Sequence, residues 1–244
     1  MSPLAEHSSE TDPLEFFLLG RRIRQGLSKC TQAAEARTGG DVFYLWLQTE
    51  PVEGAPTLTS DEWLNIVDEA ASLGVNWLVV TLGSLCGERT EIVELCRWAH
   101  STHGMVVCLH TRAGQISTHE RQLLRELPPA STFLLVDPER VDDFSDLLDE
   151  GVRVCSANPA PSATDGETCE YPHRMIFVDS RGRLYTCGMV SGERDFFLGS
   201  VLDGSLDAIM HNPQLPHSVA STDPEAHTRC SGCPPLVAKH LCHK

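Results

Sequence analysis

The sequence predicts an α/β fold in which about five strands form a parallel sheet. Each expected strand is a continuous apolar run, typical of strands buried on both faces, and a segment with helical periodicity follows each of the first four. This alternation is confined to residues 42–156 of the 244-residue chain, whereas a closed eight-stranded α/β barrel needs about 250 residues. The sheet is therefore expected to be either an open doubly wound sheet or an incomplete barrel.

The strands and helices of this region follow one another in strict order. The expected strands cover residues 42–48, 76–82, 105–110, 132–137 and 152–156. The first helix is expected over 63–73, because Thr59 and Glu62 fit a capping box before it and Gly74 fits a C-cap after it. The further helices are expected over 90–101, 119–127 and 139–150. Asp137 and Pro138, directly before the last range, are its start signal.

Two regions flank this alternating part. Residues 1–12 have the composition of a loose tail, and a basic helix is expected to start at Pro13; its arginines fit a solvated face or a docking surface for an acidic partner. Beyond Asn158 a Pro-, Ser- and Thr-rich loop precedes a β-hairpin at 174–187 with its turn at 180–182, a short strand at 196–201 and a short helix at 205–210. The sequence thus predicts three parts: residues 1–40, 41–158 and 159–244.

Composition excludes several classes of protein. Apolar residues make up 41% of the chain, enough for a sizeable core, and the formal net charge is −15. A general phosphate-backbone binder needs a positive surface, so no nucleic acid partner is expected. We expect no membrane insertion, because no apolar run approaches the roughly 20 residues of a membrane span. The polar N-terminus does not resemble a signal peptide, and a cytoplasmic location is expected.

The ten cysteines separate into two groups. In a reducing compartment such thiols are buried, catalytic or metal-bound more often than paired in disulfides. The first group occurs singly on or beside the α/β elements, and those inside apolar strands are interpreted as small buried hydrophobes: Cys30, Cys86, Cys96, Cys108 and Cys155. The second group is concentrated in the last third of the chain: Cys169, Cys187, Cys230, Cys233 and Cys242.

Four cysteines of the second group fit one tetrahedral metal centre. Cys230 and Cys233 form a C-x-x-C knuckle that can direct two thiolates at one metal, while Cys187 ends a hairpin strand and Cys169 enters the same hairpin. A set of four thiolates holds zinc or an iron–sulfur cluster. A mixed Cys/His zinc site completed by one of the nearby histidines is a further alternative, and spacing alone does not decide between them: His227, His240 and His243.

The order of these cysteines resembles the auxiliary-cluster subdomain, called twitch or SPASM, of radical S-adenosylmethionine (radical SAM) enzymes. The resemblance rests on Cys169, on GRLYTC at 182–187, on FLGSVLDGSLDAIMHNP at 197–213 and on the C-x-x-C knuckle. It implies one [4Fe–4S] cluster bound by Cys169, Cys187, Cys230 and Cys233. Cys242 lies nine residues beyond the knuckle, farther than the next cysteine of the longer form. This favours the one-cluster form and leaves Cys242 as a candidate further ligand.

The earlier part of the chain resembles the same family. The segments 58–84 and 91–114 are similar to its first two helices and the strands that follow them. Over residues 40–240 the resemblance implies a partial (β/α) barrel of about five to six parallel strands, followed by a small hairpin-containing iron–sulfur subdomain.

One departure from the family bears directly on activity. Its reactive cluster requires C-x-x-x-C-x-x-C in the loop after the first strand, but residues 48–56 contain no cysteine and the motif occurs nowhere in the chain. The Gly-Gly-Glu that receives the methionine amino group is replaced by Gly83-Ser84-Leu85. Without three thiolates there is no open iron to bind the cofactor. We therefore predict that this chain alone does not cleave S-adenosylmethionine reductively and that this molecule is not its cofactor.

Polar residues at the expected strand ends are the remaining candidates for a functional site, because functional groups of α/β barrels gather there. His110 together with Arg112 could bind an anion or take part in proton transfer, or could simply satisfy loop backbone groups. The candidates are Thr49, Glu50, Thr81, Ser84, His110, Thr111, Arg112, Asp137 and Asn158.

Three functions are compatible with these features. We favour an iron–sulfur accessory or electron-transfer subunit that works with a partner enzyme, because a fully ligated cluster suits single-electron transfer or structural stapling. The second is an enzyme that uses a retained barrel pocket, with radical SAM-type chemistry completed by a partner. The third is a zinc-stapled module that binds a peptide or protein.

Overall fold

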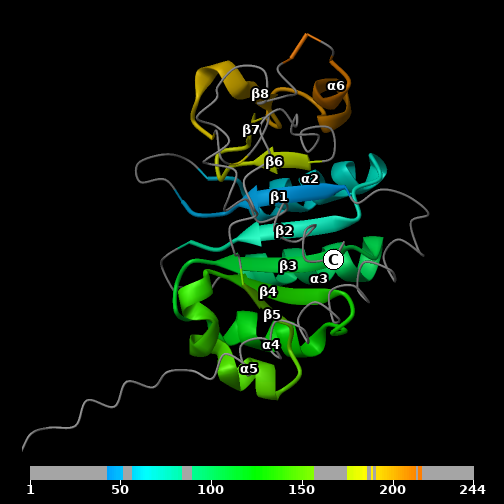
Figure 1. Ribbon diagram of the computed structural model, residues 1–244. Helices are drawn as coiled ribbons and strands as arrows, with labels where there is room; N and C mark the ends of the chain where they lie inside the picture. Colours follow the sequence, from blue (N-terminus) through cyan, green and yellow to red (C-terminus); the bar gives the residue numbers. More distant parts are fainter. Residues whose placement is uncertain are drawn as a thin grey trace, which may run out of the picture.

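Eight strands form a single sheet in the computed structural model (Figure 1). The structure describes residues 43–51, 57–83, 90–156, 175–185, 188, 191–212 and 214–215. The expected N-terminal tail and basic helix, and the loop after Asn158, lie outside these residues. All five predicted strands are confirmed: β1 (Tyr44–Gln48), β2 (Trp77–Thr81), β3 (Val106–Thr111), β4 (Thr132–Val136) and β5 (Val154–Ser156).

The sheet is open and mostly parallel. Its strand order is β5-β4-β3-β2-β1-β6-β7-β8, and every neighbouring pair from β5 to β6 is parallel. The helices between β1 and β4 lie behind the sheet in Figure 1: α2 (Ser60–Ser72), α3 (Thr90–His103) and α4 (Thr118–Glu126). Mixed α/β architecture with six parallel strands in an open sheet is consistent with the predicted partial barrel.

The helix starts are fixed by local hydrogen bonds. The predicted capping box is present before α2, where Glu62 N donates to Thr59 Oγ1 over 3.3 Å and Thr59 N donates to Glu62 Oε2 over 2.7 Å. A second capping box, between Ser117 and Glu120, starts α4. None of the helices in the described part of the chain is long and apolar enough to cross a membrane.

The segment predicted as one helix over 139–150 is divided into two. A 3₁₀-helix, η1 (Pro138–Phe144), precedes a short α-helix, α5 (Ser145–Asp149). The break falls at Phe144, whose φ of −119° and ψ of 22° depart from helical values while its ring is fully buried. The prediction of a continuous helix was wrong because tertiary burial of this ring takes precedence over local propensity.

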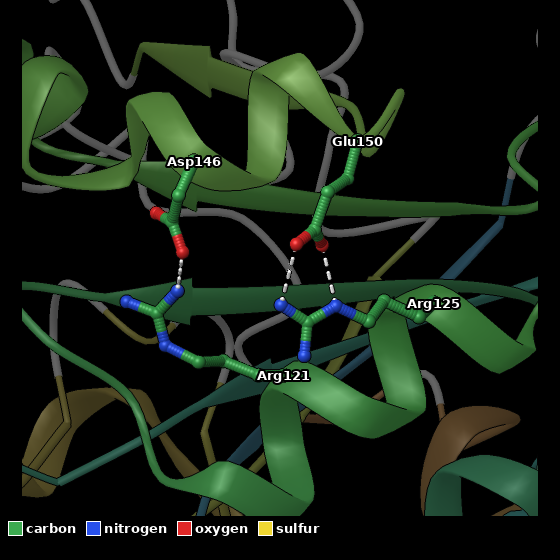
Figure 2. A network of polar contacts seen from close by, with 4 residues as sticks. All are labelled: Arg121, Arg125, Asp146 and Glu150. Atoms are coloured by element: carbon green, nitrogen blue, oxygen red, sulfur yellow. Dashed lines mark hydrogen bonds and ion pairs between the residues drawn. The ribbon is translucent and has the colours of Figure 1, made fainter.

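Ion pairs join α5 to α4 at the surface (Figure 2). Arg121 pairs with Asp146, and Arg125 binds both carboxylate oxygens of Glu150, its Nη2 lying 2.9 Å from Oε1. The hydrogen bond from Arg125 lowers the pKa of Glu150. Asp146, Arg125 and Glu150 are well exposed, so these pairs contribute little to the stability of the fold.

The predicted hairpin is present, and it continues the sheet. Its strands β6 (Met175–Val178) and β7 (Arg183–Tyr185) are antiparallel, and Gly182 adopts a φ of +76° in the turn between them. β6 lies parallel to β1, with Leu45 opposite Ile176. The short 3₁₀-helix η4 (Arg194–Phe196), β8 (Phe197–Ser200) and α6 (Leu206–Met210) follow. The hairpin is thereby anchored directly on the first strand of the α/β part.

Candidate functional site

The two faces of the sheet differ in character. Side chains alternate between faces along each strand. One set packs with α2, α3 and α4 in a single, mostly aliphatic cluster that includes Leu45, Leu78 and Leu109. The other face is aromatic and equally buried. Its rings contact one another across the strands, as in the edge-on pair Trp46–Phe177 with centroids 5.0 Å apart. We call this surface the aromatic face: Tyr44, Trp46, Trp77, Phe133, Phe177 and Tyr185.

A chain of three polar groups crosses the aromatic face, from the middle of β1 to the carboxyl ends of β2 and β3. The indole Nε1 of Trp46 donates to Thr81 Oγ1 over 2.8 Å, and Thr81 Oγ1 lies 3.0 Å from His110 Nδ1. The register places these residues near one another, because Gln48 is opposite Thr81 and Thr81 is opposite His110. The structure thus brings two of the predicted candidates, Thr81 and His110, into direct contact.

His110 is almost completely withdrawn from solvent, with 6% of its surface exposed. Burial, assisted by the positive charge of Arg112, lowers the pKa of His110 to about 4. The imidazole is therefore neutral at pH 7, which makes it a hydrogen-bonding group rather than a cation there. Arg112 itself extends into solvent, its side chain 81% exposed and its Nε 3.9 Å from Asp137 Oδ2.

The other predicted strand-end residues have mainly structural contacts. Thr49 Oγ1 donates to the carbonyl of Thr81 over 3.1 Å, and Thr111 Oγ1 accepts from Ala113 N over 3.1 Å. Both side chains satisfy backbone groups of the strand ends. Glu50 is placed at the same edge, directly after Thr49. Ser84 and Asn158 lie outside the described residues.

The cysteines of the α/β part fit their interpretation as buried hydrophobes. Cys96, Cys108 and Cys155 are each at most 1% exposed. Burial raises the pKa of the Cys96 thiol, so that the reactive thiolate is suppressed. In the ranges that the structure describes, no group of three or more His, Cys, Asp or Glu side chains is placed to hold a metal ion.

The predicted cluster ligands lie outside the described residues. So do the cysteines and histidines that the sequence singled out beside them: Cys169, Cys187, Cys230, Cys233, Cys242, Cys30, Cys86, His227, His240 and His243.

Gly188, however, shows where the residue after Cys187 lies. A β carbon added to Gly188 would be 2.5 Å from Trp46 Cζ3 and 2.7 Å from Phe177 Cδ2. Its backbone therefore runs directly against the aromatic face.

Trp46 was not foreseen as part of this arrangement. Its position in an apolar strand predicts burial, but its indole N–H bonds across strands to Thr81 and its ring packs on Gly188. A signal does exist in the sequence: residues 46, 81 and 110 can all occupy one face near the carboxyl ends of neighbouring strands. Recognising it requires the strand register.

Comparison with known proteins identifies the late part of the chain. Residues 169–234 match the family model of SPASM, an iron–sulfur cluster-binding domain. No curated protein sequence matches this chain. The matched segment begins at Cys169, includes Cys187, Cys230 and Cys233, and ends before Cys242.

Solved structures are similar to the chain in fold. The structure of Streptococcus suis SuiB bound to S-adenosylmethionine has a TM-score of 0.53 and 10% sequence identity, over 95% of this chain and 78% of that one. Another structure of SuiB has a TM-score of 0.47 and 10% identity, over 75% of this chain and 69% of that one. The likeness to the first of these structures concerns the fold, and the SPASM match adds an iron–sulfur cluster-binding segment at residues 169–234.

Proposed function

We propose that this chain, an α/β protein whose late segment matches an iron–sulfur cluster-binding domain, is an accessory or electron-transfer subunit of a partner enzyme. One [4Fe–4S] cluster is bound by Cys169, Cys187, Cys230 and Cys233, within the predicted subdomain of residues 159–244. The cluster exchanges single electrons with the partner, or it stabilises the fold of the subdomain that contacts the partner. A cytoplasmic location goes with this proposal.

The observation that carries the proposal is the extent of the SPASM match. It spans residues 169–234, so its first residue is one proposed ligand and the C-x-x-C knuckle lies just inside its end. Four cysteine thiolates satisfy all four irons of a cubane cluster. Such a cluster has no open iron for substrate, which favours electron transfer or a structural role over catalysis at the cluster.

The loop after β1 supports a non-catalytic barrel. β1 ends at Gln48, where a radical SAM enzyme carries its three-cysteine motif, and no cysteine occurs between Cys30 and Cys86. The nearby carboxylates of Glu50 and Glu53 are hard ligands that suit a soft iron–sulfur centre poorly. The loop after β1 therefore offers no thiolate for a second, reactive cluster.

The position of Gly188 supports a direct contact between the segment next to the proposed cluster and the α/β part. The residue next to proposed ligand Cys187 packs on Trp46 and Phe177, and β6 of the preceding hairpin pairs with β1. A change of charge or geometry at the cluster would act on a segment that contacts the aromatic face directly. This contact also favours the hairpin and the α/β part moving as one unit.

Cysteine variants of the full chain test the ligand set. The chain and its variants are purified without oxygen and their visible absorbance is compared. Cys187→Ala and Cys230→Ala are expected to lose most of the cluster absorbance. The buried control Cys155→Ala should keep it, and so should Cys242→Ala. Retention of the cluster in both ligand variants would contradict the assignment.

A product assay tests the absence of S-adenosylmethionine cleavage. The cluster-loaded chain is reduced with dithionite in the presence of S-adenosylmethionine, and 5′-deoxyadenosine is measured by mass spectrometry. No product above the protein-free control is expected. Formation of 5′-deoxyadenosine by the chain alone would overturn the proposed role and favour an enzyme.

A further inference from the structure

The hydrogen-bond chain on the aromatic face fixes which nitrogen of His110 carries the proton. The indole N–H of Trp46 is a donor only, so Thr81 Oγ1 accepts it at 2.8 Å. In the described part of the chain, the remaining group within reach of the Thr81 hydroxyl is His110 Nδ1, at 3.0 Å. The hydroxyl hydrogen is satisfied if it points to Nδ1, which makes Nδ1 the acceptor.

The opposite arrangement is less favourable. If Nδ1 carried the hydrogen, Thr81 Oγ1 would accept two hydrogen bonds and its own hydrogen would have no acceptor among the described residues. An unsatisfied donor in a buried position costs more than an ordinary hydrogen bond contributes. The neutral imidazole of His110 therefore carries its proton on Nε2 and presents an N–H donor there.

This donor lies where α/β folds bind ligands. His110 is the next-to-last residue of β3, so it lies at the carboxyl edge of the parallel sheet. Among the described residues the hydrogen bond of the His110 ring is made by Nδ1, and 6% of the residue's surface remains exposed.

A second group at the same edge carries a positive charge. Arg112 follows His110 by two residues, and its positive charge acts on the His110 ring. Its guanidinium contacts the described chain through Asp137 Oδ2 at 3.9 Å, longer than a hydrogen bond. A carboxylate could accept the neutral imidazole N–H with one oxygen and pair with the guanidinium through the other.

We propose that the carboxyl edge of the sheet binds a ligand carboxylate, which accepts a hydrogen bond from Nε2–H of His110 and pairs with the guanidinium of Arg112. Trp46 and Thr81 are positioning residues, since they hold the imidazole in the tautomer that donates. This site is independent of the cluster ligands.

The test uses long-range ¹H–¹⁵N NMR of histidine in the anaerobically purified full chain, with His110 assigned by the signal lost in His110→Gln. His110 is expected to show the Nε2–H pattern at pH 7. Sodium acetate, the carboxylate probe, should shift the Nε2 signal saturably, whereas sodium chloride and acetamide should not. In Thr81→Val the population of the Nε2–H tautomer should fall toward that of a free neutral imidazole.

Arginine variants separate the site from a general charge effect. Arg112→Gln is expected to weaken acetate binding about tenfold, as loss of a charge-assisted contact implies. Arg140→Gln, which removes an exposed arginine paired with Asp143, should leave it unchanged. An Nδ1–H pattern in the unaltered chain, or the absence of a saturable shift with acetate, would overturn the proposal. Equal shifts with acetate and acetamide would show that the site does not select a carboxylate.

Discussion

The backbone of Gly188 lies against the indole ring of Trp46, so closely that a β carbon at position 188 would be 2.5 Å from Cζ3 and 2.6 Å from Cη2. Real Cβ atoms essentially never approach so closely, and the neighbour is a rigid ring packed edge-on against Phe177. This contact joins the segment next to Cys187 to the first strand of the sheet. It links the proposed cluster site to the α/β part.

Gly188→Ala is therefore expected to destabilise the protein by about 1–3 kcal/mol, the usual cost of overpacking a buried contact. It should also lower the iron bound per chain, because residue 188 adjoins a proposed ligand. Chemical denaturation and metal analysis measure the two effects. Gly204→Ala is the matched control, since nothing lies within 4 Å of a β carbon there. Equal stability of the two variants would contradict the close packing of Gly188 against Trp46.

The buried imidazole of His110 predicts a dependence of stability on pH. Its pKa is about 4 in the folded chain, against about 6.5 in the unfolded chain. Between these values the unfolded state binds the proton and the folded state does not, so the free energy of unfolding falls as the pH falls. At about 1.36 kcal/mol per pKa unit, this residue accounts for a loss of about 3 kcal/mol between pH 7 and pH 4.

Urea denaturation of the unaltered chain and of His110→Phe at several pH values measures this loss. The variant lacks the titrating group, so the difference in stability between the two proteins should change across this range and level off below pH 4. Carboxylates with lowered pKa values, such as Glu150, add their own acid sensitivity to both proteins equally. Parallel curves would show that His110 does not titrate abnormally.

The turn of the β6–β7 hairpin depends on one carboxylate. Asp179 Oδ1 accepts from the backbone nitrogens of Arg181 and Arg183, while Oδ2 accepts from Arg183 Nε at 2.7 Å. The side chain is buried, so Asp179→Asn should cost about 1.5–3 kcal/mol, as expected for hydrogen bonds to a charged group. Asp203→Asn, at an exposed position, should have little effect in the same thermal denaturation. If both substitutions are neutral, the carboxylate does not hold the turn.

A single glutamate joins α2 to α6. Glu69 Oε2 accepts a hydrogen bond from the backbone N–H of Leu206 over 2.7 Å, and Leu206 is fully buried. In Glu69→Ala this N–H loses its acceptor, so hydrogen exchange over residues 206–210 should speed up by about tenfold or more. Glu94→Ala, an exposed glutamate of α3, provides the control. Unchanged exchange in Glu69→Ala would mean that α6 is held by other contacts.

The strands could be predicted because the signal for each strand lies within its own short segment of sequence. Each run of apolar residues fixes its own secondary structure, and β1 to β5 lie within one or two residues of the predicted ranges. The position of the hairpin in the sheet could not be predicted, since the pairing of β6 with β1 is a contact between distant segments. The division at Phe144 likewise accompanies burial of its ring in a core that distant segments form together.

The candidate site was predictable in its composition but not in its connections. A histidine and a threonine at strand ends suggest a functional edge, and His110 and Thr81 do meet there. The part played by Trp46 depends on register, which brings its indole to Thr81 from the adjacent strand. The neutral state of His110 depends on burial, which one strand alone does not determine.

The central claim is that the late cysteines bind an iron–sulfur cluster. Its most direct test is the content of iron, acid-labile sulfide and zinc in the full chain purified without oxygen, read together with electron paramagnetic resonance before and after dithionite. We expect about four irons and four sulfides per chain, and a paramagnetic signal that changes on reduction if the cluster transfers electrons. A colourless protein with one zinc ion and no sulfide would contradict it.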